Sequence, residues 1–153
     1  MRKLRHSFLC IFVILGLDVV GCAGHPCAPP TTVPLASPES ANFTLHVSNQ
    51  GAPRDEVDIE VLIDGKTTVK DRFCHDDGHR WTTHVLRLDP GDHALTAVTA
   101  EGEAAHSEKL RIEGAGARYW ASLDYWYSPG GKWGTEVPAK FTLVIQQTPI
   151  TFR

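Results

Sequence analysis

The 153-residue sequence has little of what would mark a nucleic-acid-binding protein or a familiar enzyme. Its formal net charge is −3, and it contains no arginine-rich run or basic stripe, which argues against a nucleic-acid partner. It also lacks a glycine-rich phosphate loop, an HExxH pair and a glycine-flanked nucleophilic serine. Apolar residues do not recur at the three-and-four spacing of an amphipathic helix. We therefore expect no catalytic residues and no helical domain.

A hydrophobic run over residues 8–17 is too short to span a bilayer comfortably, but it suits the core of a secretory signal. Arg2, Lys3 and Arg5 form a basic region ahead of it. These features predict a signal peptide over residues 1–21.

The VVGC tetrapeptide over residues 19–22 resembles the lipobox of bacterial lipoproteins. The resemblance implies cleavage before Cys22, a diacylglyceryl group on its sulfur, and a fatty acid such as palmitate on the new amino terminus. An ordinary cleavage site and an uncleaved signal anchor are the alternatives. Ala23 lacks the negative charge that retains enteric lipoproteins at the inner membrane. The expected location is the cell envelope, with a lipid anchor in a bacterial membrane, the outer one where the cell has one.

Residues 22–41 are rich in proline and contain no aromatic side chain, which is typical of an extended tether. The same composition is also expected of any stretch with too little apolar surface to fold. The remaining residues, 42–153, suffice for one domain.

From residue 42 onward, apolar and polar residues alternate with period two, and turn signals recur at short intervals. The pair Asp64 and Gly65 is typical of a tight hairpin turn in which both residues have positive φ. About seven to eight strands are expected to form a single antiparallel β-sandwich, immunoglobulin-like in the broad sense. These strands cover residues 43–47, 57–63, 66–73, 81–88, 93–100, 104–112, 118–127 and 139–147, with a short terminal strand ending at Phe152.

The segments VSNQ, VDIEVLIDGK, LRLDPGDHALTAVTAEGEA, DYWY and FTLVIQQTPITF resemble a set of poorly characterised bacterial envelope lipoproteins built on one immunoglobulin-like β-sandwich domain. The resemblance covers about two thirds of the chain. It implies the fold and the envelope location, and it implies no activity.

The segment CHDDGHRW, residues 74–81, concentrates residues that could ligate a metal. If Cys10 leaves with the signal and Cys22 carries lipid, Cys27 and Cys74 remain either as a disulfide or as two free thiols. Zinc would then be the metal expected, and a polar hairpin loop with no ligand is the alternative that we favour. The candidate ligands are His75, Asp76, Asp77 and His79, with His84 on the following strand.

The segment RYWASLDYWY, residues 118–127, predicts a strand with aromatic residues on both faces. One face could form a platform for a sugar ring, with stacking from tryptophan and hydrogen bonds from a carboxylate and a hydroxyl. The alternative, which we favour, is that both faces are covered and the tryptophans are core. We place Trp81 at the edge of the core. The platform would comprise Trp120, Ser122, Asp124 and Trp126, with Trp133 folding over them.

The sequence as a whole favours a non-catalytic, membrane-anchored envelope lipoprotein that acts as a protein-binding or structural adaptor module. Strands at the sheet edges and the loop over residues 128–138 are its expected contacts with an envelope protein. The alternative is a module that binds carbohydrate through Trp120 and Trp126, or a metal ion through the His75–His79 loop.

Overall fold

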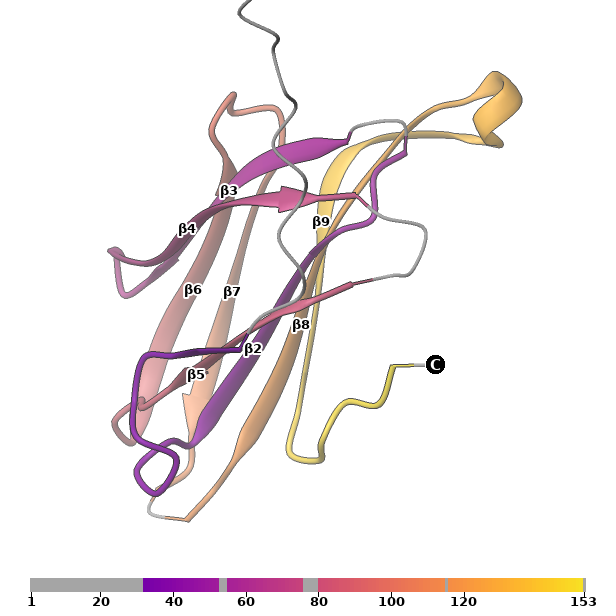
Figure 1. The fold of residues 1–153 in the computed structure, drawn as a ribbon. Helices are drawn as coiled ribbons and strands as arrows, with labels where there is room; N and C mark the ends of the chain where they lie inside the picture. The colour runs from indigo at the N-terminus through magenta and orange to yellow at the C-terminus, as the bar shows by residue number, and fades with distance from the viewer. Residues whose placement is uncertain (1–31, 53–54, 76–79, 115, 153) are drawn as a thin grey trace, which may run out of the picture.

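The computed structural model describes residues 32–52, 55–75, 80–114 and 116–152, and these residues form a β-sandwich (Figure 1). The described strands are β1 (Thr32–Pro34), β2 (Phe43–Asn49), β3 (Glu56–Ile63), β4 (Lys66–Cys74), β5 (Thr82–Leu86), β6 (Gly91–Thr99), β7 (Ala105–Ile112), β8 (Tyr119–Pro129) and β9 (Glu136–Gln146). A 3-10 helix, η1 (Gly131–Trp133), lies between β8 and β9. Within this part of the chain, no helix has the length and apolarity needed to cross a membrane.

Two sheets make up the sandwich. Sheet A has the strand order β1-β5-β2-β8-β9, and sheet B has the order β4-β3-β6-β7. Most neighbours are antiparallel, but β1 with β5 and β2 with β8 run parallel. The predicted β-sandwich is confirmed. Its likeness to immunoglobulin domains holds at the level of two packed sheets, because their constant-type strand order is different.

The core lies between the sheets and is built from the alternate residues of each strand. In β3, for example, Val57, Ile59, Val61 and Ile63 are all buried, as the period-two pattern predicts. Tyr125 of β8 is fully buried, and it packs so closely on Gly51 that a Cβ there would lie 2.9 Å from the tyrosine Cε1. A larger side chain at position 51, directly after the VSNQ segment, would therefore force the tyrosine ring to shift.

The predicted hairpin turn at Asp64 and Gly65 is confirmed, since both have positive φ, 54° and 74°. This turn is tied to the turn after β5 by one imidazole: His93 Nδ1 lies 2.7 Å from Asp64 Oδ2, and its Nε2 lies 2.8 Å from the Asp89 carbonyl oxygen. The Asp89 carbonyl, and then the Asp64 carboxylate, raise the pKa of His93 above its ordinary value. A single side chain thus holds two neighbouring turns together.

Three segments differ from their predicted structure. Part of the predicted tether, residues 32–34, forms β1 and pairs with β5, so the folded region begins before residue 42. The predicted terminal strand ending at Phe152 does not form; residues 147–152 have no strand structure. The predicted loop over residues 128–138 is mostly the end of the β8–β9 hairpin, capped by η1.

Candidate functional site

The CHDDGHRW segment is only partly described. Cys74 ends β4 and is disulfide-bonded, so it is not a free thiolate ligand. The predicted pairing with Cys27, the lipidation at Cys22 and the candidate ligands Asp76, Asp77 and His79 lie outside the described residues. His75 pairs with Asn49 in an isolated bridge. Among the described residues, no group of three or more His, Cys, Asp or Glu side chains could hold a metal ion.

Polar side chains line up across the outer face of sheet A, away from the core. The register places Ser48 of β2, Asp124 of β8 and Thr142 of β9 in one row. His46 and Ser122 lie in the next row. Because paired residues in adjacent strands lie on the same face, these side chains form one continuous strip.

Asp124 is the centre of this strip. Its Oδ1 accepts hydrogen bonds from Ser48 Oγ at 2.6 Å and from Trp81 Nε1 at 2.8 Å, and its Oδ2 accepts one from Ser122 Oγ at 3.0 Å. Gln50 Nε2 in turn donates to Ser48 Oγ at 3.0 Å. Both serines are buried although they face outward. The carboxylate therefore has three protein donors and serves as a structural acceptor.

Aromatic rings cover the strip from outside. Trp81 stacks on Phe152 with ring centroids 3.7 Å apart, and Phe152 meets the His46 ring edge-on at 5.0 Å. His46 Nδ1 lies 2.9 Å from Thr83 Oγ1. Burial lowers the pKa of His46 below its ordinary value, while the Asp124 carboxylate opposes that shift. The C-terminal segment thus covers the polar strip, and no local sequence pattern predicts this contact.

The alternation predicted for β8 is confirmed, but the favoured placement of its tryptophans in the core is wrong. Trp126 is 37% exposed, Trp120 is half-buried, and neither belongs to the core cluster. The four predicted platform residues, Trp120, Ser122, Asp124 and Trp126, lie along the outward face of β8. Six residues along a strand span about 20 Å, more than one sugar ring can bridge, and Ser122 and Asp124 are hydrogen-bonded to each other. Trp133 lies in η1, and its side chain is outside the described part of the structure.

His84 points into the sandwich interior from β5 and is 4% exposed. Neither of its ring nitrogens has a hydrogen-bond partner among the described residues. Burial lowers its pKa, and Asp71 opposes that shift. No serine or cysteine in the described part of the chain is hydrogen-bonded to this imidazole, so the arrangement does not resemble a nucleophile–base pair.

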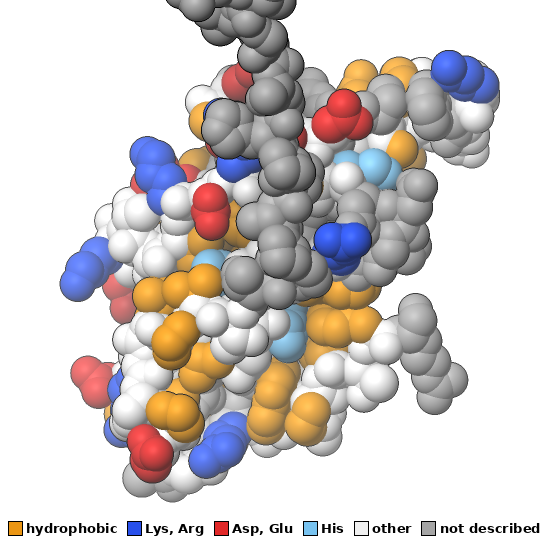
Figure 2. All heavy atoms as spheres, in the orientation of Figure 1, with side chains coloured by type: hydrophobic (Ala, Val, Ile, Leu, Met, Phe, Trp, Pro, Cys, Tyr) orange, Lys and Arg blue, Asp and Glu red, His pale blue; other side chains and the backbone are white. Residues whose placement is uncertain are grey.

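The β8–β9 hairpin extends beyond the rest of sheet A. β2 pairs with β8 only as far as Tyr125, whereas β8 and β9 continue to pair with each other to Pro129 and Glu136. We call residues 126–140 the distal ribbon; it projects past both sheets at the upper right of Figure 1. Figure 2 shows one basic side chain at its tip and hydrophobic side chains behind it. Its exposed Trp126 donates from Nε1 to Thr142 Oγ1 at 3.0 Å.

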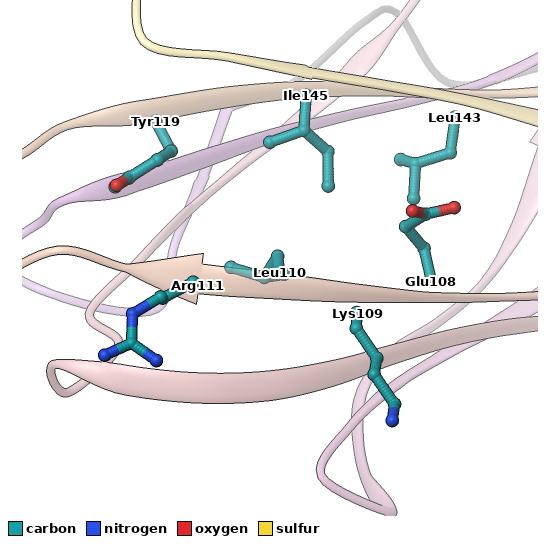
Figure 3. A pocket seen from close by; sticks show the side chains of 7 residues that line it. All are labelled: Glu108, Lys109, Leu110, Arg111, Tyr119, Leu143 and Ile145. Carbon is teal, nitrogen blue, oxygen red and sulfur yellow. The ribbon is translucent and has the colours of Figure 1, made fainter.

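A groove follows the side of the sandwich where β7 lies beside β9 (Figure 3). It has a volume of about 290 Å³. Figure 3 shows Ile145 pointing from β9 toward Leu110 of β7 and Leu143 pointing toward Glu108, while Lys109 and Arg111 point away from β9. Leu143 and Ile145 pack on the core but are only partly buried. The groove lining consists of Glu108, Lys109, Leu110, Arg111, Tyr119, Leu143 and Ile145.

No protein-family model matches the chain, and no curated protein or solved structure matches it either.

Proposed function

We propose that this chain is a non-catalytic envelope lipoprotein, anchored to a bacterial membrane through Cys22, that binds a protein partner through its distal ribbon. The anchor and the location are supported by the basic, hydrophobic and VVGC segments at the start of the sequence. The adaptor role is supported by the shape of the β8–β9 hairpin.

The observation that carries the adaptor role is that the distal ribbon is two strands wide. A two-stranded hairpin alone in water is marginally stable at best, because it has no third strand or packed layer to bury its side chains. The distal ribbon nevertheless carries an exposed indole, that of Trp126, at its base. A partner surface that packed against this ribbon would bury the indole and supply the missing layer.

The carbohydrate interpretation has less support. Among the tryptophans whose side chains the structure describes, only Trp126 has an exposed ring, and the polar groups expected to orient a sugar are hydrogen-bonded within the protein. The metal interpretation depends on residues of the 74–81 segment outside the described part of the chain.

Site-specific photocrosslinking in native membranes tests the proposal. A photoreactive residue at exposed Glu136, in the distal ribbon, should give a cross-linked protein that a probe at Asp89, in a turn after β5, does not give. Trp126→Ala should abolish the cross-link. Leu35→Ala, which removes another exposed hydrophobic side chain far from the ribbon in sequence, should leave it intact.

Two results would refute the proposal. Equal cross-linking from both probe positions would mean that the ribbon is not a selective contact. An intact mass that retains residues 1–21 and shows no fatty acid on Cys22 would remove the anchor.

A further inference from the structure

The half of β9 nearest the core has none of the features that normally protect an edge strand. Edge strands are usually guarded by charge, proline or a bulge, which prevent pairing with another chain. In this hairpin the protective features all lie in the distal ribbon: the bulge between Trp126 and Ser128, Pro138, and Lys140. The segment FTLVIQ, residues 141–146, contains no charge, proline or glycine.

This segment is also unpaired on its outer side within the described part of the chain. β9 is an edge of sheet A, and the following residues, 147–152, form no strand that could cover it. Leu143 and Ile145 face inward yet are only partly buried, because the groove beside β7 leaves them open. On the opposite face, Val144 is 54% exposed. An added strand would therefore bury apolar side chains on both faces.

We propose that residues 140–146 of β9 pair antiparallel with the same residues of a second copy of this chain, joining the two A sheets across a twofold axis. Antiparallel pairing centred on Leu143 places Leu143 opposite its own copy. It sets Phe141 opposite Ile145 and Thr142 opposite Val144, which are the aromatic and β-branched pairs that stabilise sheets. Lys140 falls opposite the neutral Gln146, so no like charges meet.

The self-complementary register supports a second copy as the occupant. The register keeps inward residues beside inward residues, so the side chains of the second copy would extend the apolar layer over the groove. The β7 rim of the groove carries both signs of charge, Glu108 beside Lys109 and Arg111. A second copy related by a twofold axis would therefore not bring two rims of the same charge together. The contact is isologous and closes on itself as a dimer.

Paired charge substitutions at Thr142 and Val144 test both the dimer and its register. Both side chains are exposed and point away from the core, so the fold should tolerate them. In the proposed register, position 142 of one copy lies opposite position 144 of the other. The double variant Thr142→Lys/Val144→Lys places two pairs of like charges at the interface. Thr142→Lys/Val144→Glu places two pairs of opposite charges there, and Thr142→Glu/Val144→Lys is its matched control.

Sedimentation of the full chain in density-matched detergent would measure self-association. We expect a monomer–dimer equilibrium for the parent and a dissociation constant weaker by about ten-fold or more for the lysine pair. The two opposite-charge variants should dimerise at least as tightly as the parent. The two variants with lysine at position 142 both lose the acceptor for the Trp126 indole N–H, so that loss does not explain a difference between them.

A parent that stays monomeric up to about 1 mM, the weak end of specific association, would overturn the proposal. Equal dimerisation of the lysine-pair and opposite-charge variants would overturn it as well, since the contact would then lie elsewhere. If Thr142→Lys/Val144→Glu were weaker than the parent, the proposed register would be wrong.

Discussion

Removing the Asp124 carboxylate should cost the protein a large part of its stability. The carboxylate accepts three hydrogen bonds, from Ser48, Ser122 and Trp81, and both serine side chains are buried. Hydrogen bonds to charged groups contribute about 1.5–3 kcal/mol each, and an unsatisfied buried donor costs about 1–3 kcal/mol. The serine hydroxyls can rotate toward other acceptors, so Asp124→Ala should lower the free energy of unfolding by about 3–5 kcal/mol.

Two variants make the Asp124 measurement specific. Asp124→Asn keeps the shape and one acceptor oxygen but turns an amide N–H toward one of the donors, so it should cost about 1–2 kcal/mol. Asp92→Ala removes a carboxylate paired with Arg111 at 2.9 Å, and both of these side chains are more than two-thirds exposed. That loss should be within about 0.5 kcal/mol.

Urea unfolding followed by tryptophan fluorescence and circular dichroism would give the three free energies of unfolding. The expected order of loss is Asp124→Ala, then Asp124→Asn, then Asp92→Ala. If the loss for Asp124→Ala were within about 0.5 kcal/mol of the loss for Asp92→Ala, the hydrogen bonds of the polar strip would not contribute to stability.

Three further changes have defined outcomes. Gly51→Ala places a Cβ 2.9 Å from the ring of the buried β8 tyrosine and should destabilise the protein by about 1–3 kcal/mol in urea unfolding; an unchanged midpoint would contradict that contact. His93 has a raised pKa, so its bridge to Asp64 is fully present below about pH 6.5 and is lost as pH rises through that pKa. The stability difference between the parent and His93→Gln should therefore shrink from pH 6 to pH 8, and a constant difference would contradict the bridge. Phe152→Ala uncovers Trp81 and should increase iodide quenching of tryptophan fluorescence. Unchanged quenching would show that the two rings do not stack in solution.

The core and the turns could be predicted from the sequence because their signals are local. Period-two alternation identifies which side chains of a strand share a face, and the Asp64–Gly65 pair specifies its own backbone conformation. Each described strand except β1 lies at or near a strand that these signals predict. The exception, β1, has three residues and lies in a proline-rich stretch, so composition indicated a tether.

The polar strip and the aromatic rings that cover it could not be predicted, because these residues meet through contacts between segments far apart in the sequence. Trp81 and Phe152 are far apart in sequence, and the sequence pattern predicts a strand at Phe152. Alternation along β8 correctly separated its two faces, but it does not tell which face other elements cover. The prediction that Trp120 and Trp126 belong to the core was wrong for this reason. Among the described residues, no further layer covers Trp126 on the outer face of the five-stranded sheet.

Both proposals involve β9, but they concern different halves of it and can be separated. Sheet A is shielded at one edge by β1, whereas at the other edge β9 extends from the distal ribbon to the unprotected segment 141–146. The two halves meet at the hydrogen bond from Trp126 to Thr142. Thr142→Lys/Val144→Lys and Thr142→Lys/Val144→Glu lose this hydrogen bond equally, because lysine has no acceptor. A change in partner cross-linking that these two variants share therefore reports on Trp126. A difference between them reports on self-association. If cross-linking at Glu136 followed dimerisation across the variants, the cross-linked protein would be the second copy, and the adaptor role of the ribbon would fail while the dimer stood.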